Sequence, residues 1–125
     1  MNTVFYVAIG GAFGASARHL VGLAALRWFG AGFPWGTIAV NIVGSLLMGL
    51  FIEALAVRFD GSTALRALIA TGFLGGFTTF SAFSLDVAVL WERGEAAPAA
   101  LYILASVVLS IAALFAGLAV GRSVF

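Results

Sequence analysis

The sequence predicts an all-α integral membrane protein with four transmembrane helices in each chain. Of its 125 residues, 63% are hydrophobic and only 9% are charged, a composition that soluble domains rarely have. Four apolar stretches each exceed the ~20 residues that a helix needs to cross the hydrocarbon core; they are Thr3–Leu26, Trp35–Val57, Leu65–Trp91 and Ala99–Gly121. Helices are favoured over barrel strands because the stretches are far longer than such strands, and because a helix satisfies its own backbone groups in lipid.

The rest of the composition predicts one small membrane domain spanning residues 1–125 and surrounded by the lipid bilayer. The connections Arg27–Pro34, Arg58–Thr63 and Glu92–Pro98 are too short to hold an extramembrane domain. No Lys or Arg precedes the first stretch, so we expect a retained helix and not a cleaved signal peptide. A net charge of +1 without a basic run argues against a nucleic-acid partner. No nucleophile–base pair or metal-ligand cluster is visible, so we do not expect an enzyme.

The basic residues give no clear orientation in the membrane. With four spans, the two termini and the Arg58–Thr63 connection share one side, which carries Arg58, Arg66 and Arg122. The other side carries Arg18, Arg27 and Arg93, provided that Arg18 lies toward the exit of the first span. An excess of Lys and Arg normally marks the cytoplasmic side. Equal numbers of arginines on the two sides, three on each, are therefore compatible with insertion in both orientations and antiparallel pairing. The alternative is an accidental balance in which one arginine dominates.

Two of the stretches carry neutral polar residues at intervals of four, which places them on one face of a helix. The second stretch has Thr37, Asn41 and Ser45, and the fourth has Tyr102, Ser106 and Ser110. Neither row contains a carboxylate, and hydroxyl and amide hydrogens can pass an anion along a pore. The other interpretation is that these groups only hydrogen-bond packed helices to one another.

The first stretch has small residues at the same spacing, Gly10 and Gly14, followed by Arg18 and Gly22. This pattern predicts a close helix contact that ends in a cation. Arg18 either attracts an anion into a vestibule or anchors the helix at the headgroups. We expect His19 to be an interfacial residue.

The third stretch contains GFLGGFTTFSAFS at 72–84 and is predicted to be broken in the middle of the span. A straight helix from Leu65 to Trp91 would be about 40 Å long, longer than the hydrocarbon core. The pairs Gly75–Gly76 and Thr78–Thr79 weaken a helix. Carbonyls freed at such a break can hold a small cation. Phe80 and Phe83 follow three residues apart, and their positively polarised ring edges could support a small anion.

The segment GFLGGFTTFSAFS, together with GTIAVNIVGS at 36–45 and GGAFGASAR at 10–18, resembles the conserved blocks of the Fluc (CrcB) family of bacterial fluoride channels. The resemblance covers essentially the whole chain. It implies an antiparallel, dual-topology homodimer in the bacterial inner membrane, with two pores that export cytoplasmic fluoride passively. The rival function is a small multidrug exporter, which can also have four spans and dual topology. Such a transporter needs an intramembrane carboxylate, and the first stretch has none.

The resemblance also implies roles for individual residues. The fluoride path would comprise Asn41, Phe80, Phe83, Thr37, Tyr102, Ser106, Ser110 and Thr79. Arg18 would lie in a vestibule. The carbonyls of Gly75 and Thr78 would hold a structural Na⁺ ion shared between the two chains at the dimer centre. Ala82 stands where the family commonly has threonine, and Asp86 where it commonly has glutamate, so fine tuning of the pore is expected to differ.

Overall fold

The structure, a computed structural model, describes residues 2–125 and is entirely helical apart from short connections. Its elements are α1 (Asn2–Phe29), α2 (Trp35–Arg58), α3 (Thr63–Leu65), the π-helix η1 (Arg66–Leu74), α4 (Gly75–Phe77), α5 (Ser81–Glu92) and α6 (Ala96–Val124). Four helical segments of 24 to 30 residues are long and apolar enough to cross a membrane: α1, α2, the interrupted segment Thr63–Glu92, and α6. The four predicted spans are therefore confirmed.

The connections are shorter than the sequence predicted, at residues 30–34, 59–62 and 93–95. The largest difference is at Pro98, which we expected in the last connection but which lies in the first turn of α6. A proline is tolerated there because the first N–H groups of a helix have no partner within the helix.

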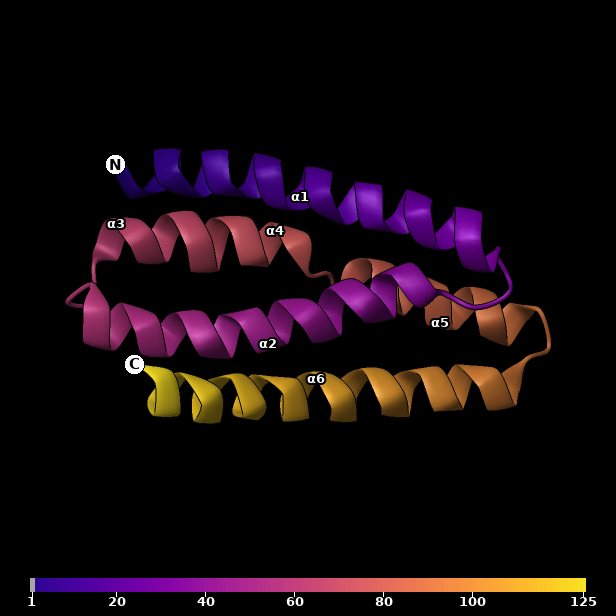
Figure 1. Ribbon diagram of the computed structural model, residues 1–125. Helices are drawn as coiled ribbons and strands as arrows, with labels where there is room; N and C mark the ends of the chain where they lie inside the picture. The colour runs from indigo at the N-terminus through magenta and orange to yellow at the C-terminus, as the bar shows by residue number, and fades with distance from the viewer. Residues whose placement is uncertain (1) are drawn as a thin grey trace.

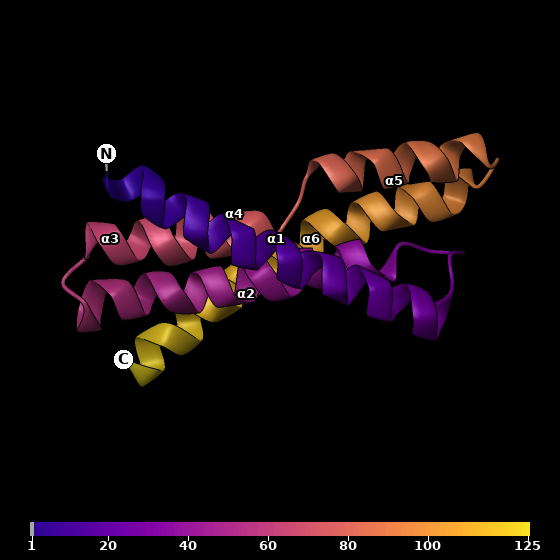
Figure 2. The same cartoon turned by 90° about the horizontal axis from the view of Figure 1, so that it is seen from above.

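The third span consists of two halves placed end to end along the molecule (Figure 1). The segment from α3 to α4 occupies one half of the long axis and α5 the other, and a short link joins them near the middle. Both chain termini lie at the same end. Seen from above, α5 and the first part of α6 run side by side, away from α1 (Figure 2). The break therefore places its backbone near the centre of the bundle.

Glycines set the closest helix contacts. A Cβ atom added to Gly10 would lie 2.8 Å from the backbone nitrogen of Phe73 in η1, a distance that real Cβ atoms do not reach. A Cβ on Gly117 would lie 2.9 Å from the nitrogen of Leu50, where α6 crosses α2. Without side chains at these positions the backbones touch, as in other small-residue contacts of membrane helices. The close contact predicted for the first span is confirmed.

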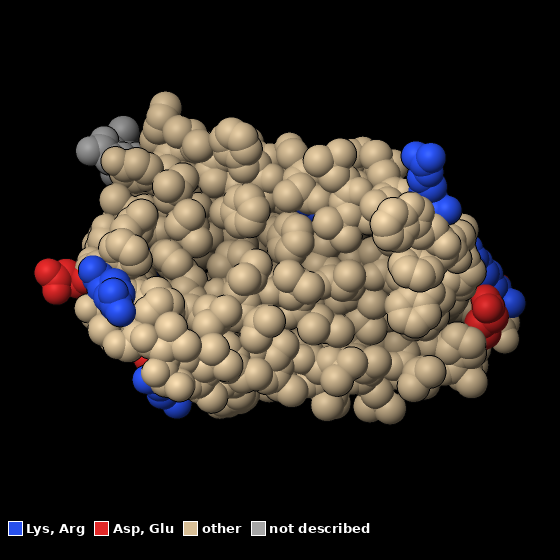
Figure 3. Space-filling model, viewed as in Figure 1, with Lys and Arg blue, Asp and Glu red and all other residues tan. Residues whose placement is uncertain are grey.

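Charged side chains gather at the two ends of the molecule, and the middle of the visible face is almost entirely free of them (Figure 3). Arg18 is the exception. It lies well inside α1, half-buried, and its Nε donates to the carbonyl of Gly76 at 2.9 Å. Arg18 was counted with the far side only on the condition that it lies toward the exit of the first span; it lies part-way along α1, where its guanidinium bonds a carbonyl next to the break. The count of arginines at the two ends becomes three against two, with Arg27 and Arg93 opposite the termini.

Candidate functional site: the helix break and its cavity

The chain leaves the helix at Thr78, whose backbone is extended with φ −88° and ψ 160°. The sequence predicted the break around Gly75–Gly76 and Thr78–Thr79, and both glycines turn out to be helical. Gly76 is needed for packing, since a Cβ there would lie 2.9 Å from the carbonyl oxygen of Gly11 in α1. The preceding π-helix η1 was not predicted. The break therefore begins at the threonines and not at the glycines.

The side chain of Asn41 pairs with the backbone of Thr79 at two points. Its Nδ2 donates to the Thr79 carbonyl at 2.9 Å, and its Oδ1 accepts from the Thr79 N–H at 2.7 Å. Backbone groups left unpaired at membrane depth are costly, and this amide replaces the helical partners that Thr79 has lost. One N–H of Nδ2 remains to donate elsewhere. Asn41 thus fixes the break as well as lining the cavity described below.

The two threonines complete the hydrogen bonding of the break. The Thr78 hydroxyl donates to the carbonyl of Leu74 at 2.9 Å, and the Thr79 hydroxyl accepts from the N–H of Ala82 at 3.1 Å, at the start of α5. Within residues 2–125, no hydrogen bond ends on the carbonyl oxygen of Gly75 or of Thr78. Two unpaired carbonyl oxygens suit a hard cation such as Na⁺, which binds oxygen ligands.

A cavity of about 400 Å³ lies between α2, the break and α6. Six of the eight residues predicted for the fluoride path line it: Asn41, Thr79, Phe80, Phe83, Ser106 and Ser110. Ser45, from the predicted polar row of α2, lines it too, and Gly44 gives room where α2 meets Thr78. Sequence reasoning missed Gly44, for which the only signal was a small residue beside a polar row.

The hydroxyls of Ser106 and Ser110 are buried in the wall of this cavity. In the described part of the chain, neither Oγ atom has a hydrogen-bond partner. Buried polar atoms are nearly always paired, and a serine in a helix can bond the carbonyl four residues earlier. These two hydroxyls do not, so their hydrogens remain to be donated into the cavity. Within the described chain, neither serine hydroxyl hydrogen-bonds one helix to another.

The two phenylalanines differ sharply in exposure. Phe83 is 8% exposed, whereas Phe80 is 76% exposed at the rim of the cavity. Their ring centroids lie 5.5 Å apart, with the planes tilted by 48°. The pair does lie together, as predicted, but one chain encloses only Phe83.

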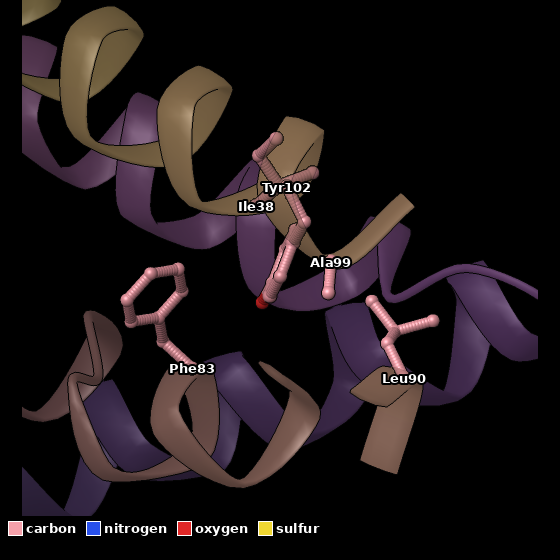
Figure 4. Close-up of a cluster of buried hydrophobic side chains, with 5 residues drawn as sticks. All are labelled: Ile38, Phe83, Leu90, Ala99 and Tyr102. Atoms are coloured by element: carbon pink, nitrogen blue, oxygen red, sulfur yellow. The ribbon is translucent and has the colours of Figure 1, made fainter. Parts of the chain in front are cut away.

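Tyr102 lies apart from the cavity, in a cluster of buried side chains with Ile38, Phe83, Leu90 and Ala99 (Figure 4). Its ring centroid is 5.2 Å from that of Phe83. Its hydroxyl donates to Asp86 at 2.9 Å. Tyr102 is fully buried, and its O–H hydrogen is committed to the carboxylate. The Tyr102 ring therefore packs against the ring of Phe83 and is not among the residues that line the main cavity.

Thr37 and Arg18 also lie outside the main cavity. Both line a second cavity of about 270 Å³ between α1, α2 and the start of α5, with Thr79 in its wall. Thr37 also borders a third cavity of about 280 Å³, together with Asp86 and Arg93. Thr79, whose backbone Asn41 holds, lines both the main and the second cavity.

Residues 5–118 match the family described as "CrcB-like protein, Camphor Resistance (CrcB)". The chain belongs to the CrcB family. It is 59% identical over 124 residues to a protein of Chelativorans sp. (strain BNC1) named "Fluoride-specific ion channel FluC", covering 99% of both chains. Proteins of the same name from Agrobacterium fabrum and Rhizobium etli (strain CIAT 652) are 56% and 58% identical, over 100% and 98% of each chain. The suspected family is confirmed over nearly the whole length.

Proposed function

We propose that this CrcB family member is a fluoride channel of the bacterial inner membrane that lets cytoplasmic fluoride leave passively. The observation that carries the proposal is the pair of unpartnered hydroxyls, Ser106 and Ser110, in a cavity that also holds Asn41 and two phenylalanines. Relatives that match over full length are named fluoride-specific channels.

The chemistry of the cavity suits a small, strongly hydrated anion. Fluoride gives up water only where other donors replace it, and the serine hydroxyls and the remaining Asn41 N–H are neutral donors. The edge of an aromatic ring is positively polarised, so Phe80 and Phe83 add support without a fixed charge. No carboxylate lines the main cavity among the residues described, which favours an anion over a cation.

The channel is proposed to work as an antiparallel homodimer, because one chain leaves the cavity incomplete. Phe80 stands 76% exposed at its rim, and a second chain would cover it and enclose the path. The arginine excess of three against two is small, so it biases insertion only weakly. Two chains of opposite orientation would then be made from one sequence.

A sodium ion between the two chains is part of the same proposal. The carbonyls of Gly75 and Thr78 fit such an ion because both are unpaired. Bound there, Na⁺ would supply positive charge that holds the broken helices together, and no pore step requires its movement.

Fluoride efflux from liposomes that contain the purified protein tests the function. We expect fluoride to leave at a rate proportional to the amount of protein, driven by its own gradient, while chloride does not. A multidrug exporter would instead move organic cations against a proton gradient and leave fluoride trapped. Fluoride retention equal to that of protein-free liposomes would contradict the channel proposal.

Two variants with opposite bias test the dimer. Adding three lysines at the carboxyl terminus, or three in the connection at residues 30–34, should force single orientations. Each variant alone should lose flux, and co-expression should restore it. Full flux from either variant alone would contradict the antiparallel dimer.

A further inference from the structure

Arg18 lies inside the first span, and its side chain bonds the backbone of the third. Its Nε donates to the Gly76 carbonyl at 2.9 Å, between residues 58 positions apart in the sequence. The side chain is half-buried. A charge within the hydrocarbon region is costly, and arginines found there pair with other charged groups or with backbone carbonyls. An arginine kept at such a position is a candidate for a functional role, and its partner here is the segment at the break.

The Gly76 carbonyl has lost the partner that a continuous helix would give it. That partner would be the N–H of Phe80, four residues on, but the backbone becomes extended at Thr78. The Arg18 guanidinium supplies a donor in its place. The last carbonyls of a helix also carry partial negative charge, which favours a cation near them. Arg18 thus caps the first half of the third span where α4 ends.

Small residues bring α1 close enough for this contact. A Cβ on Gly14 would lie 2.9 Å from the carbonyl carbon of Phe73 and 3.0 Å from the backbone nitrogen of Phe77. Gly14 and Arg18 are four residues apart in α1, so they share one face of the helix. The backbones of α1 and of the segment before the break therefore touch within one turn of Arg18. This contact sets the point at which the arginine side chain meets the end of α4.

The break is held by two neighbouring helices. Arg18 of α1 holds the Gly76 carbonyl, and Asn41 of α2 holds both backbone groups of Thr79. The turn at Thr78 lies between these two contacts. Thr79 and Asn41 line the main cavity, whereas Arg18 is not among the residues that line it. Arg18 can therefore act on that cavity through the backbone of the break, without touching an anion in it.

We infer that Arg18 is a positioning residue for the fluoride path: its hydrogen bond to Gly76 fixes the end of the first half of the third span, and with it the place of Thr79. The inference rests on the proposed fluoride channel. It differs from the vestibule role that the family resemblance implied, in which the positive charge of Arg18 attracts the anion. In the positioning role the donor at Gly76 is essential, and in the attracting role the charge is essential.

Arg18→Gln and Arg18→Met form a matched pair that separates the donor from the charge. The side-chain nitrogen of glutamine and the terminal methyl of methionine stand the same number of bonds from Cα as the arginine Nε. Both changes remove the charge, but only glutamine offers an N–H to Gly76. Because a charge inside a span is costly, we expect both variants to insert and fold, which gel filtration checks. Arg18→Leu is a second apolar variant if Arg18→Met does not fold.

The first measurement is initial fluoride efflux from liposomes over a range of fluoride concentrations. We expect Arg18→Met to lower the maximal rate by about tenfold, because the Gly76 carbonyl loses its donor, and to leave the half-saturating fluoride concentration unchanged. Arg18→Gln should stay within about threefold of the unaltered protein, because a neutral hydrogen bond is weaker than a charge-assisted one. Equal loss in the two variants would overturn the inference, since the donor would then make no difference.

The second measurement, hydrogen exchange at the break, does not depend on fluoride. The N–H groups of Thr79 and Ala82 bond to side chains there, so their exchange reports local opening of this segment. We expect faster exchange over residues 77–84 in Arg18→Met and unchanged exchange in Arg18→Gln. Unchanged exchange or unchanged maximal flux in Arg18→Met would also overturn the inference. If the unaltered protein releases no more fluoride than protein-free liposomes, the channel itself is contradicted, and the exchange measurement still decides whether Arg18 holds the break.

Discussion

Asn41 of α2 and Thr79 of the helix break are joined by two hydrogen bonds, of 2.9 and 2.7 Å, between a side-chain amide and one residue's backbone. The Asn41 amide offers Thr79 one donor and one acceptor, as a neighbouring strand does for a residue in a β-sheet. Because Asn41 also lines the main cavity, the residue that stabilises the break also borders the proposed anion path.

We predict that Asn41→Asp destabilises the break and blocks flux. The aspartate can still accept from the Thr79 N–H, but it places a carboxylate oxygen against the Thr79 carbonyl, which loses its donor. Leaving a buried group unsatisfied costs about 1–3 kcal/mol. A negative charge in the cavity also opposes anion entry, and a loss of more than tenfold in flux requires only about 1.4 kcal/mol. Thermal stability in detergent and initial fluoride efflux are the measurements; wild-type flux in this variant would contradict the role of Asn41.

We predict that Ser106→Ala and Ser110→Ala lower flux without lowering stability. Each change removes a buried hydroxyl that has no partner in the described chain, so unfolding should cost the same energy or slightly more. The matched control is Ser16→Ala, whose hydroxyl bonds the Ala12 carbonyl at 2.7 Å on the exposed side of α1. The control should conduct normally. If both cavity variants conduct as well as the control, these hydroxyls do not serve the anion.

The helices themselves were predictable because apolar length alone specifies a membrane span, and the four stretches agreed with the structure. The residue at which the last connection ends was not predictable, because a proline such as Pro98 is common in turns and is also tolerated in the first turn of a helix. The predicted break of the third span began at Gly75, three residues before Thr78, where the chain leaves the helix. The π-helix before it packs against α1, and no local sequence pattern predicted it.

The candidate site was predictable as a set of residues but not as an arrangement. Spacing placed Asn41, Ser106 and Ser110 on the correct faces. It could not show that Tyr102 gives its hydrogen to Asp86, or that Arg18 reaches a carbonyl 58 positions away. Both contacts depend on how separate helices meet, and the Arg18 contact changed the charge count on which the orientation argument depended.

We predict that Phe80→Met and Phe83→Ile separate packing from pore lining. Phe80 is largely exposed in one chain, so its replacement should change the folding stability of a single chain by less than about 0.5 kcal/mol. Phe83 packs against Tyr102, and a swap of similar volume there should cost under about 1.5 kcal/mol. If ring edges support the anion, both variants should lose flux by more than tenfold while remaining folded by gel filtration. Normal flux in both would make these phenylalanines ordinary packing residues.

The two adjacent glycines of the break give opposite predictions and so test the proposed sodium site. A Cβ on Gly76 would lie 2.9 Å from the Gly11 carbonyl oxygen and 3.1 Å from the Ala15 nitrogen. We therefore expect Gly76→Ala to push α1 away and to destabilise the single chain, by about 1–3 kcal/mol as for other overpacked sites. A Cβ on Gly75 would meet nothing closer than the Ala70 carbonyl oxygen, at 3.6 Å, which is ordinary contact.

Gly75→Val should accordingly leave each chain folded and act only where a second chain approaches. If the Gly75 carbonyl holds a shared Na⁺ at the dimer centre, the valine should keep the two chains apart. The variant would then elute as a monomer with unchanged helical circular dichroism. The unaltered protein should be more heat-stable in Na⁺ than in K⁺, because a site that binds only the assembled state stabilises it by mass action, and the variant should lose this difference. Gly75→Ala, with its smaller side chain, provides the intermediate case. If the Gly75→Val protein still forms dimers and is still more heat-stable in Na⁺ than in K⁺, the proposed sodium site is contradicted. The cation and the contact between chains would then have to lie away from this break.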